Sequence, residues 1–561
     1  MALLQQRPPV MERTAAAAEE SAKLHKHFRR FDVLFFLICT LVGIDLIGSI
    51  ASNGGESFTW LVVVVLAFFV PYALLTAELG STFPDEGGQY VWTRLAFGRL
   101  VAAVNNVLYW VTNPVWLGGS LTILAMTVGT TFFNNGEDVN GLAFYIPAMT
   151  FIWVGVLSAI LSFQIGKWIA TIGAAMRFIV LGAFGITCIV FGIKNGFGGM
   201  ADVSFTPSYA GFLVLVPLLL FSFVGFELPS AAGEEMKDPQ KDVPFAVVRS
   251  AIGSTILYAL PILGILLVLP ASQLTSLGGF IDAIKTVFTV YGGDVASDGT
   301  PTLSGVGLVL GDLMAIGFIL TLLTSGVTWI MGSDRSLAVS GYDGTAPRAL
   351  GGISERFGTP VRVNVLSGLV ATLVCVLAHQ ITGGDAQKYF SAVIGVTIST
   401  TLISYIFIFP ALPILRYKFP NVARPYAVPG GNIGTIIVGV ITTIWVLFGT
   451  IVIFAPGLGN GWFGSGGTFD DGLPHAWEGQ RISYTLTEIT PVLVFIAVGV
   501  IFWWVGRKTA AQTVPFDLTV SGAEGTLNLN AMAPHGTAGT TAVETMGDPV
   551  GVWRDQNGPR I

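Results

Sequence analysis

The chain has 561 residues, of which 52% are apolar and only 11% are charged, and its mean hydropathy is +0.71. This composition is typical of a polytopic membrane protein and excludes an ordinary soluble domain. The formal net charge of −6 argues against a nucleic-acid partner. The three cysteines lie in apolar runs without the spacing of a zinc site or a disulfide framework, so we expect no metal and no cofactor.

About twelve apolar stretches are long enough to cross the roughly 30 Å hydrocarbon core as helices. The first five predicted spans lie near 31–52, 58–82, 101–133, 142–163 and 168–193. The next five lie near 209–234, 245–270, 305–342, 362–380 and 389–415. Two more are predicted near 434–456 and 487–506. The predicted fold class is therefore an all-α integral membrane protein.

The 28 Lys and Arg residues predict the orientation, because basic loops remain in the cytoplasm. With a cytoplasmic N-terminus, the outward loops and span ends carry only Lys194, Lys285, Lys388 and Arg481. Residues 1–30 and 507–561 are then cytoplasmic tails, and the polar, aperiodic composition of 1–27 and 508–561 predicts disorder. No cleavable signal peptide precedes span 1, which we expect to act as the signal anchor of a multi-pass plasma-membrane protein.

Span 6 has features that are unusual for a transmembrane helix. Residues 221–244 read FSFVGFELPSAAGEEMKDPQKDVP, with Gly225, Glu227, Pro229 and Gly233 at bilayer depth. In hydrocarbon every backbone polar group needs an internal partner, so such a helix survives only where it is buried or lines a cavity. Transporters use discontinuous helices to hold polar substrates near the midplane of the membrane. The segment therefore predicts a secondary transporter.

Three segments of the chain have a distinctive sequence. Span 2 ends in AELGSTFPDEGGQYVWTRLAFG at 77–98, span 6 supplies GFE and then EEMKDPQKDVP, and span 8 leads into SDRSLAVSGYDGTAPRALGGISERFGTPV. Together they resemble the amino acid–polyamine–organocation (APC) superfamily, and in particular bacterial amino acid permeases. The likeness extends from about Phe31 to Lys418. It implies a LeuT-type fold, in which 31–193 and 209–416 are inverted repeats, spans 1 and 6 are broken, and 434–506 adds two spans.

The resemblance also implies a substrate site at the two breaks. In similar transporters a GSG-type segment of span 1 binds the substrate carboxylate through backbone N–H groups, and this chain has Gly48, Ser49 and Ile50 there. The isoleucine replaces the second glycine and narrows the approach of an α-amino acid. The alternative is that these small residues only pack helices together.

The facing half of the expected site comes from span 6. It comprises Phe221, Ser222, Phe223 and Gly225, whose carbonyl groups suit an ammonium group. Phe221 matches an aromatic gate position of related exchangers, where a ring contacts the cationic face of the substrate. Simple packing of the phenylalanine is the alternative interpretation.

Three ionisable residues lie at membrane depth, namely Asp45, Arg177 and Glu227. Each costs roughly 2.5–3.5 kcal/mol at a helix centre, which makes a functional role the first hypothesis. We expect Asp45 to pair with Arg177, and the resemblance places Arg177 where a tethered cation replaces sodium beside span 1. Glu227 is the candidate proton carrier, because arginine does not release its proton. The alternative is that Glu227 caps the broken helix.

Other polar groups have weaker signals. Span 3 contains a polar and aromatic cluster that borders the expected cavity, formed by Trp110, Asn113, Pro114 and Trp116. In span 8 the hydroxyls of Thr324, Ser325 and Thr328 either coordinate a cation or bond to their own helix. The charged residues of the cytoplasmic loops either form an inner gate or are simply solvated. They are Glu86, Glu234, Glu235, Lys237, Asp238, Arg335 and Asp343.

These features predict a secondary active transporter of amino acids or related amines that works by alternating access, as an exchanger or with protons. No phosphate loop or nucleophile–base arrangement supports ATP hydrolysis or enzymatic catalysis. The expected partners are a small-molecule substrate, protons and the lipid bilayer. A polyamine or γ-aminobutyrate exchanger is the alternative substrate class. A non-transporting substrate sensor with this fold is the alternative functional class.

Overall fold

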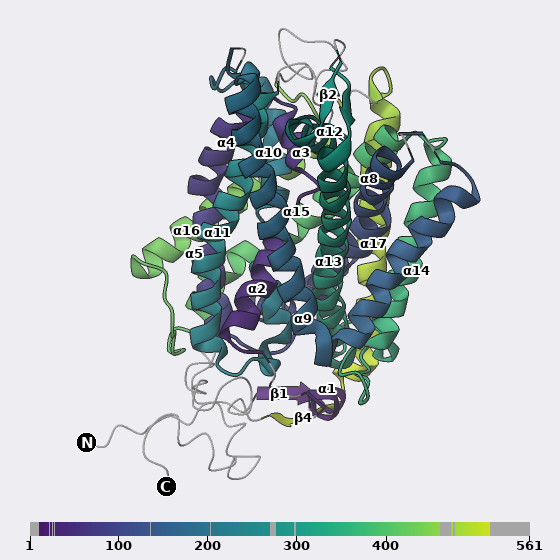
Figure 1. Cartoon of the computed structure of the whole chain (residues 1–561). Helices are drawn as coiled ribbons and strands as arrows, with labels where there is room; N and C mark the ends of the chain where they lie inside the picture. The colour runs from purple at the N-terminus through teal and green to yellow at the C-terminus, as the bar shows by residue number, and fades with distance from the viewer. Residues whose placement is uncertain are drawn as a thin grey trace.

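The computed structural model describes residues 11–516 except positions 22, 25, 27, 135, 138, 202, 270–276, 297–298, 460–472 and 475–476. The side chains of 11–13, 162–167, 200–201 and 513–516 are also outside this description. Helices that run roughly side by side make up most of the described chain (Figure 1).

Ten helical stretches of the described chain are long and apolar enough to cross a membrane, which confirms the predicted all-α membrane class. They are Glu56–Thr82, Arg99–Phe133, Leu142–Leu161, Trp168–Asn195, Pro239–Val268, Gly305–Asp343, Val361–Ile381, Ala386–Lys418, Gly431–Phe454 and Arg481–Ala510. Each overlaps one of the predicted spans. The two predicted spans without a continuous helix are 1 and 6.

The continuous spans are built from the following elements. The first half contains α4 (Glu56–Val64), η1 (Val65–Phe69), α5 (Val70–Thr82), α7 (Arg99–Trp116), η2 (Leu117–Leu121), α8 (Thr122–Phe133) and α9 (Leu142–Asn195), which carries two spans. The second half contains α11 (Pro239–Val268), α13 (Gly305–Asp343), α14 (Val361–Ile381), α15 (Ala386–Lys418), α16 (Gly431–Phe454) and α17 (Arg481–Ala510).

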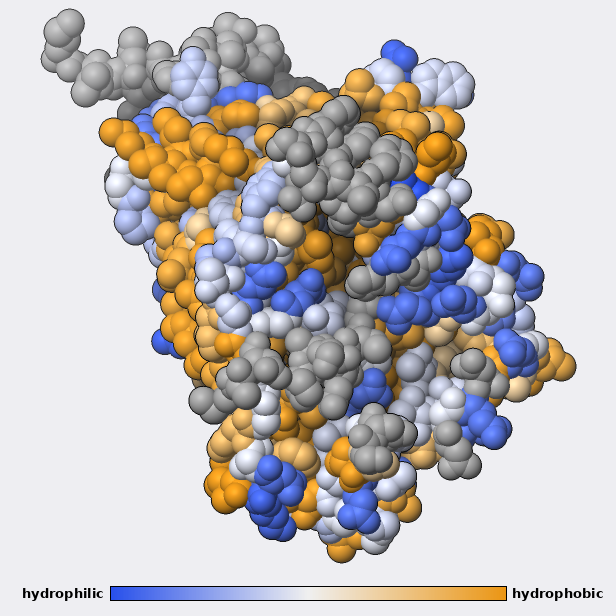
Figure 2. Space-filling view, turned by 90° about the horizontal axis from the view of Figure 1, so that it is seen from above, coloured by the Kyte–Doolittle hydropathy of each residue, from blue (hydrophilic) through white to orange (hydrophobic). Residues whose placement is uncertain are grey.

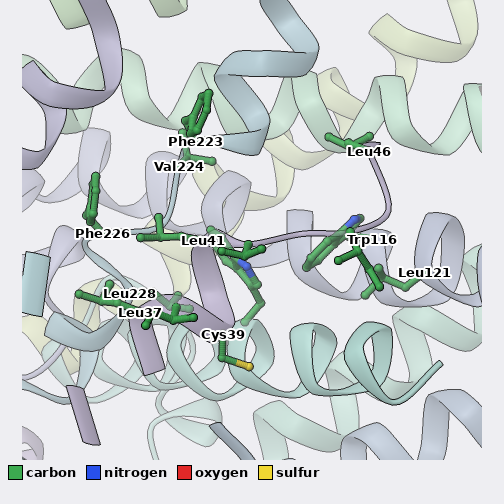
Figure 3. Close-up of a cluster of buried hydrophobic side chains, with 14 of the residues drawn as sticks. Leu37, Cys39, Leu41, Leu46, Trp116, Leu121, Phe223, Val224, Phe226 and Leu228 are labelled. Carbon is green, nitrogen blue, oxygen red and sulfur yellow. The ribbon is translucent and has the colours of Figure 1, made fainter. Parts of the chain in front are cut away.

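Spans 1 and 6 are both broken in their middle. Span 1 consists of α2 (Arg30–Leu41) and α3 (Ile47–Ala51), joined by a non-helical connection that Figure 3 shows between Leu41 and Leu46. Span 6 consists of α10 (Tyr209–Ser222) and the 3-10 helix η4 (Leu228–Glu235). Gly225 lies in this second break with a φ of +126°, a conformation that side chains rarely adopt. Each predicted repeat therefore opens with a broken helix, whereas the repeat relation itself stays a prediction.

Short elements lie at the two ends of the bundle. One end carries α12 (Gly279–Phe288), η6 (Thr289–Tyr291) and a hairpin of β2 (Gly293–Val295) and β3 (Pro301–Leu303). The loops also contain α6 (Gln89–Phe97), η3 (Gly198–Ala201) and η7 (Arg348–Leu350). Figure 2 shows hydrophilic residues on the α12 end and hydrophobic residues around much of its edge, as expected for a bundle surrounded by lipid.

The described parts of both tails differ from the predicted disorder. Residues Met11–Thr14 form β1, which pairs antiparallel with β4 (Thr513–Phe516), and α1 (Ala15–Ser21) follows directly. All three lie together at the end of the bundle opposite α12 (Figure 1). A strand of four residues is too short to show a recognisable hydrophobic periodicity. Its stability also depends on pairing with a segment at the other end of the chain, which the local sequence does not indicate. Residues 1–10 and 517–561 lie outside the described residues.

The core follows the apolar faces of the helices. In the most apolar 18-residue stretch of α15, 83% of the residues are buried, compared with 17% in the corresponding stretch of α17. Helix α15 therefore lies inside the bundle and α17 at its edge. Large residues on α16 that face outward include Ile433, Ile437, Ile444 and Ile451. Exposed aliphatic side chains in such a helix are suited to lipid contact.

Candidate functional site

A cavity lies beside both helix breaks. In this conformation the cavity is narrow: only about 20 Å³ is open to the centre of a water-sized sphere, so it must widen to admit a small organic molecule. The residues around it come from spans 1, 3, 6, 7, 8 and 10. They are Thr40, Leu41, Gly43, Asp45, Leu46, Thr112, Asn113, Trp116, Phe221, Ser222, Val224, Tyr258, Trp329 and Thr401.

Asp45 is the acidic group of this cavity. It lies in the non-helical connection after α2, it is 4% exposed, and its Oδ2 accepts a hydrogen bond of 2.9 Å from Trp116 Nε1. Among the described residues no Lys or Arg forms an ion pair with it, although ion pairs are present elsewhere in the bundle. The predicted pairing with Arg177 is not a direct ion pair in this conformation, although the guanidinium is near enough to attract this carboxylate electrostatically. A buried carboxylate without a direct ion pair is costly unless other groups or a bound cation compensate it.

Aromatic rings line the cavity next to this carboxylate. The Trp116 ring packs edge to face against Phe221, with centroids 6.0 Å apart, and against Trp329 at 6.2 Å. Trp329 is held by a hydrogen bond of 3.1 Å from its Nε1 to the Thr40 carbonyl. Figure 3 shows Trp116 beside the connection between α2 and α3. Rings around a carboxylate form a favourable environment for an organic cation, since ring faces attract positive charge.

Tyrosine hydroxyls satisfy backbone N–H groups in both breaks. The Gly43 N–H donates to the Tyr258 hydroxyl at 2.8 Å. The N–H groups of Gly225 and Phe226 donate to the Tyr72 hydroxyl at 3.0 and 2.9 Å. In a water-poor interior an unpaired backbone donor is costly, so these hydroxyls stabilise the unwound segments.

Glu227 lies outside the cavity, in a cluster of three tyrosines. Its carboxylate accepts hydrogen bonds from Tyr109 at 2.7 Å, from Tyr405 at 2.6 Å, and from Tyr72. Tyr72 belongs to α5, Tyr109 to α7 and Tyr405 to α15, so this acid joins the second half of span 6 to three other spans. The Glu227 backbone N–H also hydrogen-bonds to this carboxylate, so capping of the broken helix stays the alternative interpretation.

Arg177 lies between the end of α2 and the middle of α13. Its Nε donates to the Val42 carbonyl at 2.7 Å, and its Nη2 donates to the Ser325 hydroxyl at 2.5 Å. Its Nη1 donates to the Gly173 carbonyl at 2.8 Å. The guanidinium therefore takes the carbonyl and hydroxyl oxygens that a hard metal cation would otherwise bind. Of the three span 8 hydroxyls considered above, Ser325 and Thr324 contact Arg177, the latter at 3.4 Å.

A buried ion cluster closes the end of the bundle that carries α1. Arg335 pairs with Glu86 at 2.9 Å and with Glu235 at 2.7 Å, and these side chains are only 1–3% exposed. Burial raises the pKa of Glu86, in the loop after span 2, well above its ordinary value despite the neighbouring guanidinium. A second pair joins Asp343 to Arg94 at 2.6 Å. These contacts favour an inner gate over freely solvated charges.

The cavity contains only part of the predicted site. It includes Asp45, Phe221 and Ser222. Gly48, Ser49 and Ile50 are buried in α3, and a Cβ on Gly48 would lie 2.9 Å from the Phe280 backbone nitrogen, so that glycine packs against another segment. Phe223 packs on Phe69 and Tyr258. Asn113 and Trp116 line the cavity as the polar cluster of span 3 suggested.

Sequence reasoning missed two residues that carry much of the site, namely Tyr258 and Trp329. Tyr258 is a tyrosine in an otherwise apolar span, which is a weak signal for a buried hydrogen bond. Trp329 lies one turn from Ser325, in the stretch of span 8 whose hydroxyl groups were considered as cation ligands. Neither residue is adjacent to a break in the sequence.

Comparison with known proteins agrees with this arrangement. A family model described as "Amino acid permease" matches residues 28–464. The chain is 27% identical to "Probable agmatine/putrescine antiporter AguD" of Lactococcus lactis, over 72% of this chain and 83% of that protein. It is 28% identical to an uncharacterized transporter of Legionella pneumophila (76% and 89%) and 22% identical to "Branched-chain amino acid permease BcaP" of Bacillus subtilis (78% and 94%). The chain belongs to the amino acid permease family of the APC superfamily, and it is a secondary transporter.

Proposed function

We propose that this transporter carries an amine whose ammonium group binds the Asp45 carboxylate in the central cavity. The observation that supports the proposal is a buried carboxylate, 4% exposed, without an ion-pair partner among the described residues and next to Trp116. An ammonium group would neutralise the buried charge and would also lie against the rings of Phe221 and Trp329. The relative named as an agmatine/putrescine antiporter is consistent with such a substrate.

Transport would proceed by alternating access, with two layers of contacts on one side of the cavity. The first layer is Glu227 with its three tyrosine partners, and the second is the buried cluster around Arg335. Both layers join the second half of span 6 to other helices, so both must separate before the cavity opens towards that end. We assign this end to the cytoplasm of a plasma-membrane protein, with both termini on that side, because the basic loops predict that orientation.

Two charged groups outside the cavity have proposed roles in coupling. Arg177 occupies a fixed cationic position beside span 1, which makes transport independent of sodium. Glu227 is the proposed proton-binding group, because its protonation would remove the negative charge that three hydroxyls now stabilise. Substitution of Glu227 by Gln should then abolish any pH dependence of transport. An unchanged pH profile would exclude Glu227 as the proton carrier.

The test is uptake into proteoliposomes of labelled amines and amino acids, with and without unlabelled substrate inside, at a fixed pH gradient. We expect uptake of an amine into preloaded vesicles, as in an exchanger. Uptake into empty vesicles that collapses with the pH gradient would establish proton symport instead. Absence of uptake for every compound, with protein that is folded and inserted, would refute transport and favour the sensor hypothesis.

A further inference from the structure

Tyrosine hydroxyls bind three of the backbone N–H groups in the two breaks. In the general design of broken-helix transporters, the N–H groups freed by unwinding bind an anionic group of the substrate. Here the Gly43 N–H in span 1 is already bound by the Tyr258 hydroxyl, and Tyr72 binds both N–H groups of the span 6 break, those of Gly225 and Phe226. These three N–H groups are therefore not available to a substrate carboxylate in this conformation.

Tyr258 is well placed for this role. It comes from α11, is 1% exposed and lines the cavity, and its ring packs edge to face on Phe223 with centroids 5.3 Å apart. A Cβ built on Gly43 would lie 2.7 Å from Asp45 Oδ1 and 3.5 Å from the Tyr258 hydroxyl. The hydroxyl, the glycine N–H and the carboxylate are thus immediate neighbours. A carboxylate that approached the Gly43 N–H would have to displace the hydroxyl and would face Asp45.

The electrostatics act in the same direction. Two carboxylates next to each other in a buried site repel, and such juxtaposition of like charges costs several kcal/mol. Selectivity then arises from a group that penalises the wrong ligand as well as from one that attracts the right ligand. A cation that lacks a carboxylate meets neither obstacle.

We propose, resting on the proposed function, that Tyr258 and Asp45 together exclude α-carboxylates, so that the transporter selects organic amines over the amino acids from which they derive by decarboxylation. Tyr258 is then a specificity-determining residue that acts by occupying a backbone donor. The role of Asp45 is double, because it attracts the ammonium group and repels the carboxylate.

The experiment compares substrate pairs that differ only in a carboxylate, namely agmatine with arginine and putrescine with ornithine. Uptake of each compound into preloaded proteoliposomes gives the ratio of transport efficiencies. We expect the unmodified protein to favour the amine by at least about 100-fold. Tyr258→Phe frees the Gly43 N–H and should reduce the ratio about ten-fold, mainly by improving uptake of the amino acid.

The control is Tyr389→Phe, which removes another buried hydroxyl from a transmembrane helix. Tyr389 donates to the Gly118 carbonyl at 2.7 Å and does not line the cavity, so loss of its hydroxyl should leave the ratio unchanged.

Asp45→Asn provides a second test that does not depend on Tyr258, and it should reduce the ratio by lowering amine uptake. Equal efficiency for amine and amino acid in the unmodified protein would overturn the inference while leaving transport itself intact. An unchanged ratio in Tyr258→Phe would overturn the role of Tyr258, and failure of all uptake would refute the proposed function instead.

Discussion

Replacing Asp45 by Asn tests the substrate site most directly. The two side chains have nearly the same shape, and Asn retains an oxygen that can accept the 2.9 Å hydrogen bond from Trp116 Nε1. The change therefore removes the negative charge and little else. A hydrogen bond between charged groups contributes about 1.5–3 kcal/mol. Since about 1.4 kcal/mol corresponds to a factor of ten, the affinity for an amine should fall about 10–150-fold.

The assay is the binding of agmatine and putrescine to purified protein in detergent, measured by substrate-dependent thermal stabilisation. A ligand that binds only the folded state raises Tm. The amine concentration needed for a given rise in Tm should therefore increase by the same factor as the dissociation constant. Asp312→Asn is the matched control, since this carboxylate belongs to a spanning helix, α13, but does not line the cavity. Unchanged amine affinity in Asp45→Asn, in protein that melts normally, would refute the assignment of Asp45 as the ammonium site.

Three further changes test other parts of the molecule. Arg177→Ala leaves the Val42 carbonyl and the Ser325 hydroxyl without a cation, so amine transport should fall at least about ten-fold. Addition of sodium should restore part of this transport. Recovery that does not depend on sodium would contradict the role of Arg177 as a fixed cation. Burial raises the pKa of Glu86 well above its ordinary value of 4.5, so the folded state loses stability as the pH rises above that ordinary range. Glu86→Gln should therefore flatten the fall in Tm with rising pH, whereas Glu355→Gln, at an exposed loop position, should not. Glu20→Ala removes hydrogen bonds to the loop after α13 and should weaken the attachment of α1 to that loop. The amide hydrogens of residues 11–21 should then exchange faster. Glu19→Ala is the control, because the Glu19 side chain is 66% exposed, and it should leave that exchange unchanged.

Hydropathy accounts for the helices well, because a span has to satisfy both a length and an apolar composition. The eleventh predicted span, 434–456, corresponds to α16 at Gly431–Phe454, and the ninth, 362–380, to α14 at Val361–Ile381. The break in span 6 could also be predicted, since Gly225 and Pro229 are poorly suited to an uninterrupted helix in lipid. The pairing of β1 with β4 could not, because its partners lie at opposite ends of the chain.

The partners of the buried charges were harder to predict, because they depend on where each helix stops and not on how apolar it is. Membrane depth and the family resemblance together suggested that Asp45 and Arg177 would neutralise each other. Unwinding after α2 instead leaves the Val42 carbonyl free, and Arg177 binds it at 2.7 Å. The same unwinding frees the Gly43 N–H, which Tyr258 binds at 2.8 Å. With those two backbone groups bound to the nearby cation and hydroxyl, Asp45 has no direct ion pair. On the proposed function, the same break therefore shapes the cavity and leaves the charge that attracts the amine.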